Sequence, residues 1–270
     1  GKPLKEWDVN IYYGIKTGLN EAFIIDTPTK ERLCQEDPKS AEVLKPILRG
    51  RDIKRYSYEW AGLWLIVTFP ALKIDIEKYP VVKKYLLEFG KERLEQEGKE
   101  LPDGTKSRKK TGNKWFETQD QIAYYPEFEK EKVVWKRIGS VIRFAYDNQG
   151  TYALDSNVIM TGKELQYLCG FLNSKLGIKL LLDKAPKTGT GDVIISVQAL
   201  EPLLVPPITP TNHSIVEKIE KLVEEILQQK NIGAGYEPVP TTPLEKQIDE
   251  LVYQLYGLTD EEIKIVEGKE

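Results

Sequence analysis

Few residues of this 270-residue chain have the types and spacing that catalysis requires. The single histidine, His213, lies among prolines, threonines and an asparagine without a visible serine or cysteine partner, so we do not expect it to be catalytic. The glycines of "KTGTGDV", residues 187–193, are spaced like a phosphate loop, but they precede an expected strand instead of opening a helix. The carboxylates of "EFEKEK", residues 127–132, can be forced into a nuclease pattern, but so charged a chain produces such matches by chance.

Basic side chains suggest a different chemistry, because lysine and arginine bind phosphate groups. Residues 45–55, "KPILRGRDIKR", carry five basic groups and one acidic group. Residues 105–116, "TKSRKKTGNKWF", carry five basic groups and no acidic group. Ordinary solvated surface charge is the alternative interpretation of either stretch.

The charge of the chain is distributed unevenly. The formal net charge is −3, which by itself argues against nucleic-acid binding. Residues 214–270 hold 13 acidic and 6 basic residues, so residues 1–213 hold 33 basic and 29 acidic residues and are net positive. Because local patches, not net charge, meet a phosphate backbone, nucleic-acid binding stays open.

Composition places the chain among globular proteins, with 40% hydrophobic and 30% charged residues. Its two cysteines, Cys34 and Cys169, make no disulfide scaffold and predict a reducing, cytoplasmic setting. With one histidine and no cysteine pair at ligand spacing, we expect no metal site. No apolar run approaches 18 residues, so we expect no membrane partner. The start Gly-Lys-Pro and the lack of a visible signal peptide suggest an excised fragment.

The pattern of apolar residues, glycines and prolines predicts a mixed α+β fold with helices and twisted sheets. We expect two strands around a Gly14–Gly18 loop in residues 9–26. The other expected elements are a short helix at 37–48, a strand at 60–69, a helix at 77–98, a long polar loop at 99–114, strands at 132–147 and 152–162, a helical region at 162–184, a strand at 191–197 and a proline-rich connection at 201–213.

The C-terminal residues predict an antiparallel pair of amphipathic helices. Ser214 with Glu217 fits a capping box at the start of the first helix, and Thr259 with Glu262 fits another at a last short helix. We therefore expect a globular domain of residues 1–213 and a C-terminal helical appendage of residues 214–270. If the apolar stripes are buried, changing Leu222 or Leu251 to alanine should cost roughly 2–5 kcal/mol.

Several stretches, in order, resemble one protein family. They are "GIKTGLNEAFIID", "ILRGRDIKRY", "WFETQDQIAYYPEFEKEKVVWKRI", "FAYDNQGTYALDSNVIM", "YLCGFLNSKLGIKLLL" and "IDELVYQLYGLTDEEIKIVE". Together they resemble the TaqI-like C-terminal target-recognition domain of adenine-specific DNA methyltransferases and type IIG restriction-modification enzymes. The resemblance covers about residues 9–267, and the domain is also similar to the half-subunits of type I specificity proteins.

The resemblance implies that this chain recognises a sequence in double-stranded DNA but carries no catalytic site and no cofactor. In the family, an N-terminal domain binds S-adenosylmethionine and methylates a flipped adenine through an N-P-P-Y type motif. This chain has neither that motif nor a cofactor glycine loop. The resemblance therefore implies a methyltransferase domain of the same protein as a partner, possibly with a fused endonuclease.

Candidate DNA-binding residues follow from the resemblance and from side-chain chemistry. In the family, the stretch matching Gly14–Phe23 lies near the DNA, and its glycines would allow close backbone approach. The candidates are Lys16, Thr17, Asn20, Arg49, Arg51, Lys54, Arg55, Lys106, Arg108, Lys109, Lys110 and Lys114. We expect the loop of the last five to be flexible and to bind phosphates, and the arginines at 49–55 to read guanine or bind phosphate, unless Asp52 pairs with one of them.

Other residues near these candidates have structural interpretations. We expect Trp115 and Phe116 to anchor the core and not to stack on bases. Asn173 and Ser174 interrupt an apolar helix and fit a helix-packing feature. Two alternative functions stay open: a protein-interaction scaffold that uses the acidic helices, and a nuclease with a site hidden among the carboxylates.

Overall fold

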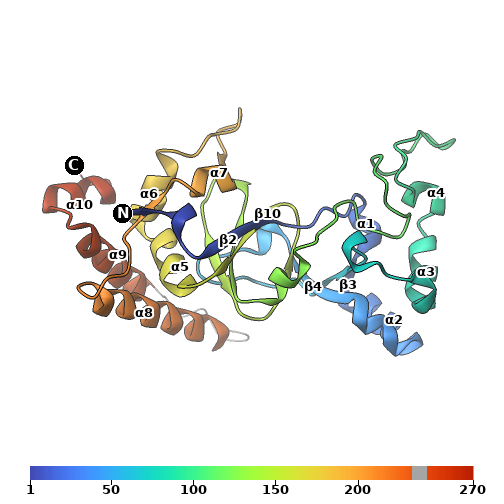
Figure 1. The fold of residues 1–270 in the computed structure, drawn as a ribbon, viewed down its shortest axis with the longest axis horizontal. Coiled ribbons are helices and arrows are strands. Elements are labelled where there is room, and N and C mark those ends of the chain that lie inside the picture. Colours follow the sequence, from blue (N-terminus) through green and yellow to red (C-terminus); the bar gives the residue numbers. More distant parts are fainter. Residues whose placement is uncertain (233–241, 270) are drawn as a thin grey trace.

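A computed structural model of the chain describes residues 1–232 and 242–269. The molecule is elongated (Figure 1), with helices α1 to α4 at one end, strands in the middle and helices α5 to α10 at the other end. Helices and several small sheets are both present, which confirms the mixed α+β class. The described residues include no helix that is both long and apolar enough to cross a membrane.

A four-stranded antiparallel sheet forms the centre of the molecule. Its strands lie in the order β2, β10, β6, β8, and they span Val9–Tyr13, Asn157–Gly162, Lys132–Lys136 and Phe144–Asp147. Because side chains alternate along a strand, Trp135 of β6 faces a cluster shared with the C-terminal helices, whereas its neighbour Val134 faces the other half of the molecule.

A second four-stranded sheet lies beside the first and holds β3, β5, β4 and β9 in that order. These strands span Ile24–Asp26, Leu63–Ile66, Leu44–Leu48 and Tyr152–Ala153, and only the β4–β9 pair is parallel. Two short pairs complete the strands: β1 (Lys2–Pro3) with β12 (Leu204–Val205), and β7 (Ile138–Gly139) with β11 (Val193–Ile194).

Helices lie around the second sheet, where α1 and α2 contact its strands and α3 packs against α2. They are α1 (Asn20–Phe23), α2 (Thr27–Glu36), α3 (Pro80–Leu87) and α4 (Lys91–Leu94), with 3₁₀ turns η2 (Pro38–Val43), η3 (Gly50–Asp52), η4 (Pro70–Leu72), η5 (Ile76–Lys78) and η6 (Tyr125–Glu129). Asp26 caps α2 by accepting a hydrogen bond from the Thr29 amide at 2.9 Å. Proline opens α3 where its missing N–H costs nothing.

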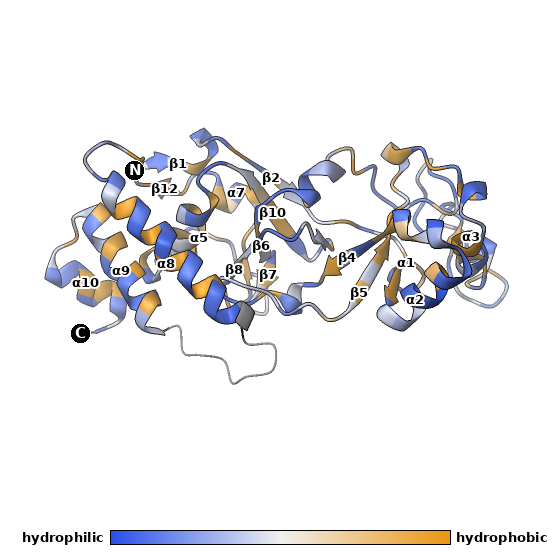
Figure 2. Ribbon diagram, turned by 90° about the horizontal axis from the view of Figure 1, so that it is seen from below, coloured by the Kyte–Doolittle hydropathy of each residue, from blue (hydrophilic) through white to orange (hydrophobic). Residues whose placement is uncertain are grey.

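Helices α5 to α10 form the other end of the molecule, and α5 packs directly against β6 and β8 of the central sheet. They are α5 (Leu165–Asn173), α6 (Lys175–Leu182), α7 (Val197–Leu200), α8 (His213–Ile232), α9 (Thr242–Tyr256) and α10 (Asp260–Glu267), and the 3₁₀ turn η1 (Leu4–Glu6) lies at the N-terminus. Helix α8 packs against α5 and α9, and α9 returns beside it in the opposite direction (Figure 1). Hydrophobic and hydrophilic residues alternate in stripes on α8 and α9 (Figure 2).

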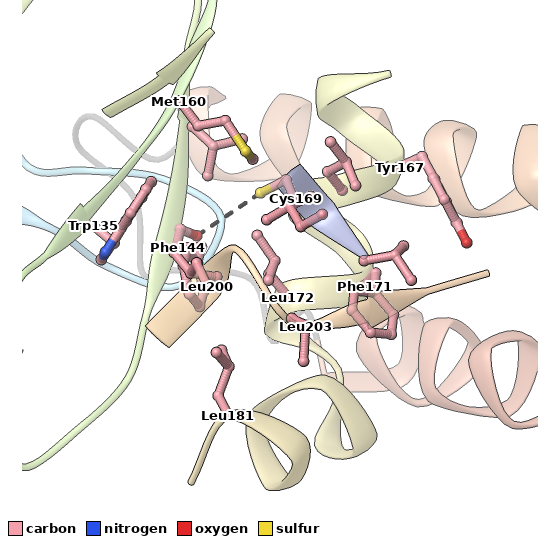
Figure 3. Packing of buried hydrophobic residues seen from close by; sticks show 14 of the residues in the cluster. Trp135, Phe144, Met160, Tyr167, Cys169, Phe171, Leu172, Leu181, Leu200 and Leu203 are labelled. Carbon is pink, nitrogen blue, oxygen red and sulfur yellow. Dashed lines mark hydrogen bonds between the residues drawn. The ribbon is translucent and has the colours of Figure 1, made fainter. Parts of the chain in front are cut away.

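Two hydrophobic clusters lie on either side of the central sheet. Figure 3 shows part of the first, where Trp135 and Phe144 from the sheet meet Cys169, Leu172 and other side chains of the helices. The buried hydrophobic residues of α8 and α9 belong to this same cluster. The boundary at residue 213 stays a prediction.

Several predicted elements differ in the structure. Residues 9–26 do not form a hairpin, because β2 pairs with β10 and β3 pairs with β5 in a different sheet. Residues 37–48 form the 3₁₀ turn η2 followed by strand β4 instead of one helix, and Pro46 is paired within that strand. The helix predicted at 77–98 ends near Glu88, because Gly90 takes a positive φ of 86°.

The strands predicted at 60–69, 132–147, 152–162 and 191–197 are present as shorter segments, which confirms them. The helical region at 162–184 is two helices, since Ser174 leaves the helical conformation and accepts a hydrogen bond from the Gly177 amide. The capping box at Thr259 and Glu262 is confirmed. Helix α8 begins at His213, one residue before the predicted cap Ser214.

Candidate nucleic-acid interface

The Gly14–Gly18 loop approaches its own chain closely. A Cβ atom on Gly14 would lie 1.9 Å from the carbonyl oxygen of Leu154, so only glycine fits where the loop crosses the segment after β9. The Gly14 amide donates to the Asn157 carbonyl at 3.0 Å, and the Ile15 amide donates to the Ala153 carbonyl at 2.8 Å. Gly14 therefore allows the backbone contact that joins the two sheets, whereas we predicted that it allows close approach to a ligand.

Of the three candidates on this loop, only Lys16 has an exposed side chain that makes no hydrogen bond or ion pair with the described residues. Thr17 is 1% exposed, and its hydroxyl donates to Asn20 Oδ1 at 2.6 Å and accepts from the Leu19 amide. These bonds fix the start of α1. Thr17 and Asn20 thus have local structural roles that the sequence did not indicate.

Arg49 and Arg51 are neighbours with different environments. Arg49 donates from Nε and Nη2 to the carboxylate of Asp52, with Nη2 2.7 Å from Oδ1, and Asp52 is 4% exposed. This hydrogen bond raises the pKa of Arg49. The internal pair that the sequence left open is therefore present. Arg51 is exposed and makes no ion pair among residues 1–232 and 242–269.

Lys54 and Arg55 also have carboxylate partners. Lys54 Nζ lies 3.1 Å from Glu59, an exposed pair of small energetic weight. Arg55 lies 2.9 Å from Glu245 of α9 and donates to the carbonyl of Asn173 at 2.5 Å, while Lys230 of α8 donates to the Arg55 carbonyl. Arg55 thus joins the C-terminal helices to the rest of the molecule, a role different from the predicted one.

Arg108 lies beneath the long basic loop. It is 3% exposed, and its guanidinium donates to the carbonyl oxygens of Leu94, Thr17, Glu117 and Trp115 at 2.6–2.9 Å. Burial lowers its pKa to about 10, so it stays charged at neutral pH. The predicted flexible loop is held in place by this buried arginine and by the bonds of its own backbone, such as Gly98 N–H to Arg108 O at 2.9 Å.

The lysines of the same loop point to solvent. Lys106, Lys109, Lys110 and Lys114 are exposed, and Lys114 Nζ lies 5.6 Å from the centre of the Phe116 ring. Phe116 is buried and Trp115 packs against the same cluster, which confirms both as core anchors. Burial raises the pKa of Asp120, and the charges of Lys16 and Lys109 oppose this rise. Lys16 and Lys109 are therefore close enough to act on one carboxyl group.

Three further basic residues gather where the two sheets meet. Lys136, Arg137 and Arg143 lie at the ends of β6 and β8, in stretches that we predicted as strands and did not include among candidates. One hollow is lined by Arg51, Lys136 and Arg143, and a neighbouring one by Lys136, Arg137 and Asp155. We call Arg51, Lys136, Arg137 and Arg143 the waist cluster. Within the described residues, none of the four makes an ion pair.

One turn holds the waist cluster together. The Ser156 hydroxyl accepts from the Gly50 amide at 3.0 Å, and the Ser156 carbonyl accepts from the Arg137 amide at 2.8 Å. The Asp155 amide donates to the Ile15 carbonyl, which ties Lys16 to the same turn. No sequence pattern predicted that these residues are neighbours. Residues 15, 50, 137 and 156 come together only because strands of both sheets pair in the folded chain.

Other singled-out residues have structural environments. Asn173 exchanges hydrogen bonds with the backbone of Phe144 on β8, and its side chain also donates to the Cys169 carbonyl, which confirms the packing interpretation. His213 is exposed, and its Nδ1 lies 3.5 Å from Glu217.

The carboxylates at 127–131 do not converge on one point. Glu127 binds Lys130 and Thr161, Glu129 binds Lys45 and Tyr152, and Glu131 accepts from Tyr146. Across residues 1–232 and 242–269, no group of three or more acidic, histidine or cysteine side chains could hold a metal ion.

Comparison with known proteins identifies the class. The TaqI-like C-terminal specificity domain family matches residues 45–201, more than half of the chain, and the chain belongs to this family. No curated protein sequence matches significantly.

Two solved structures are similar to the chain. The type IIL restriction-modification enzyme MmeI, solved in complex with DNA, is 16% identical, with a TM-score of 0.61 over 98% of this chain. The type IIG restriction endonuclease BpuSI is 14% identical, with a TM-score of 0.49 over 94% of this chain. This chain spans about a third of each, 35% and 31% respectively.

Proposed function

We propose that this chain recognises a target sequence in double-stranded DNA as the specificity domain of a cytoplasmic restriction-modification enzyme. The observation that carries the proposal is the waist cluster, four cations that make no ion pair among residues 1–232 and 242–269, in a member of a specificity-domain family. Clustered cations without acidic partners attract a phosphate backbone. The fold shared with MmeI, a protein solved with DNA, supports the same conclusion.

In this proposal, chemistry belongs to another part of the enzyme. An adenine-specific methyltransferase domain of the same protein would bind S-adenosylmethionine, while this chain holds the DNA so that one adenine can be flipped out and methylated. This chain's own residues would position the duplex and distinguish its sequence. Phosphate contacts give position, and contacts to base edges give sequence.

A selection from random duplexes tests the proposal. The chain is incubated with a pool of DNA duplexes that contain a randomised segment, and bound molecules are amplified and sequenced over several rounds. We expect one motif to be enriched and to compete at least tenfold better than its scrambled version at constant salt. The proposal is overturned if the chain binds no duplex. It is also overturned if no motif is enriched either by the chain alone or by the chain fused to its methyltransferase domain.

A further inference from the structure

One hollow of the waist cluster has the composition of an anion site. It encloses about 270 Å³ and is lined by Gly50, Arg51, Ile53, Lys136, Gly139, Ser140, Val141 and Arg143. Three of these residues are cations and none is acidic. A hollow with this lining has a positive potential, because none of its own lining residues carries a negative charge.

The lysine of the hollow lies in a slot made by two glycines. A Cβ atom on Gly50 would lie 2.9 Å from Lys136 Cγ, and one on Gly139 would lie 3.3 Å from Lys136 Nζ. Neither glycine has a positive φ, so the backbone does not require glycine at these positions. Gly50 is needed for space, because a Cβ atom there would meet the stem of Lys136, and Gly139 leaves room for the end of the same side chain.

The walls of this slot are fixed by hydrogen bonds. The Gly50 amide donates to Ser156 Oγ at 3.0 Å, and the adjacent Asp52 is held by Arg49. On the other side, Gly139 pairs with Val193 of β11. The carbon stem of Lys136 therefore lies against two walls that are in place before any ligand arrives. Those walls limit the conformations of the side chain, which lowers the entropy that binding would cost.

We propose that this hollow binds one phosphate group of the DNA backbone, with Lys136 as the central donor and Arg51 and Arg143 as flanking donors. The Ser140 hydroxyl, exposed at the same rim, would supply a fourth donor. The assignment to DNA rests on the proposed function. A single phosphate held in a preformed hollow sets the register of the duplex on the protein and carries no sequence information.

The first experiment examines the hollow without DNA. Amide resonances of the ¹⁵N-labelled chain are followed while inorganic phosphate, and separately dimethyl phosphate, replaces chloride up to 50 mM at constant ionic strength. We expect saturable shifts at Gly139 and Ser140 that disappear in Lys136→Gln. Gly50→Ala keeps every charge but displaces the lysine, so it should weaken phosphate binding at least fivefold.

Gly112→Ala is the matched control, because a Cβ atom there meets nothing within 4 Å and its φ is not positive. It should leave phosphate binding unchanged. Thermal melting of each variant separates a loss of binding from a loss of folding. Absence of saturable shifts at the hollow, or shifts that persist in Lys136→Gln, overturns the proposal whether or not the chain binds DNA.

The second experiment asks whether the phosphate comes from DNA. Equilibrium binding of a fixed duplex is measured at several salt concentrations for the wild type, Lys136→Gln and the control Lys264→Gln, which removes an exposed charge from α10. The salt slope should become shallower by about 0.9 for Lys136→Gln and stay unchanged for the control. If the hollow binds inorganic phosphate but Lys136→Gln leaves DNA binding and its slope unchanged, the hollow is a site for a free phosphate group and the assignment to DNA is wrong.

Discussion

At the scale of single residues, the guanidinium groups of this chain occupy two environments. Arg108 donates to four backbone carbonyls, and Arg49 and Arg55 each have a carboxylate partner. Arg51, Arg137 and Arg143 have none among the described residues. A guanidinium bound inside the protein stabilises the fold, whereas one without a partner is free to bind a ligand anion.

Arg108→Leu should therefore destabilise the chain severely. The substitution removes the side chain that donates to the carbonyls of both Leu94 and Thr17, and it leaves these acceptors without that donor. We expect a loss of roughly 3 kcal/mol or more in the free energy of unfolding, measured by urea titration. Its neighbour Lys109→Leu, which is exposed, serves as the control and should change stability by less than about 0.5 kcal/mol. Equal stability of the two variants would contradict the assigned role.

Arg49→Gln and Arg51→Gln should separate stability from binding. Arg49→Gln leaves the buried Asp52 carboxylate without its guanidinium and should cost about 1–3 kcal/mol of stability. Arg51→Gln should leave unfolding unchanged, while DNA affinity falls and the salt slope becomes shallower. Urea titration and duplex binding on both variants test this, and a stability loss in Arg51→Gln alone would reverse the assignment.

The sequence identified the basic stretches but could not separate their roles. Arg49 and Arg51 are two positions apart in "RGRD", and only the 3₁₀ turn η3 directs one to Asp52 and the other to solvent. Lys136, Arg137 and Arg143 gave no signal, because Lys136 ends β6, Arg137 follows it and Arg143 precedes β8, and a charged residue is ordinary at the end of a strand. Their proximity to Arg51 depends on contacts between segments about 90 residues apart in the chain.

At the scale of elements, the apolar residues of helix α8 differ in how deeply they are buried. Ile219, Val223 and Ile226 of α8 are buried, whereas Leu222 is half-buried and lies with Leu251 in a groove between α8 and α9. The face toward α5 is so close that a Cβ atom on Gly170 would lie 2.7 Å from Ile219 Cγ2. The spacing of apolar residues predicted the helix pair, but it did not predict which side of α8 packs against α5.

Ile219→Ala and Leu222→Ala should differ in their effect on stability. Ile219 is completely buried between α8 and α5, so its truncation leaves a cavity and should cost about 2–5 kcal/mol. Leu222 borders solvent, so its truncation should cost about 1 kcal/mol or less, which revises the larger loss expected for a buried site. Thermal or urea unfolding of both variants provides the measurement, and equal losses would show that the assignment of faces is wrong.

Gly170→Ala should also destabilise the chain, for a steric reason. Alanine normally favours a helix over glycine by roughly 1 kcal/mol, but here the added methyl group meets the stiff side chains of Ile219 and Val223. We expect a net loss of roughly 1–3 kcal/mol from overpacking. A stabilised Gly170→Ala variant in the same unfolding assay would mean that α8 packs against α5 less closely than the structure shows.

At the scale of the whole molecule, one sheet supports two hydrophobic clusters and carries basic residues at the junction. Strand patterns and helix periods were enough to predict the mixed class and most elements. They could not show that β2 and β3 belong to different sheets, because strand pairing depends on partners far along the chain. The junction, and with it the waist cluster, exists only in the assembled fold.

The exposed lysines of the long loop belong to this larger surface. Lys109 acts with Lys16 on Asp120, and Asp155, which also acts on Asp120, lines a hollow with Lys136. Lysine ammonium groups are point charges that suit phosphates and carry little directional information. We therefore expect Lys109→Gln with Lys110→Gln to weaken binding to every duplex about equally and to leave the selected motif unchanged.

The salt slope of this double variant should be shallower than that of the wild type by about two units, one for each lost phosphate contact. Adding Lys136→Gln should reduce the slope by about one further unit, because Lys136 shares no contact with these lysines among the described residues. Binding of the wild type, the double variant and the triple variant to selected and scrambled duplexes at several salt concentrations measures both changes. A double variant that loses its preference for the selected motif would mean that the loop reads bases, and a triple variant no weaker than the double would place Lys136 away from the DNA.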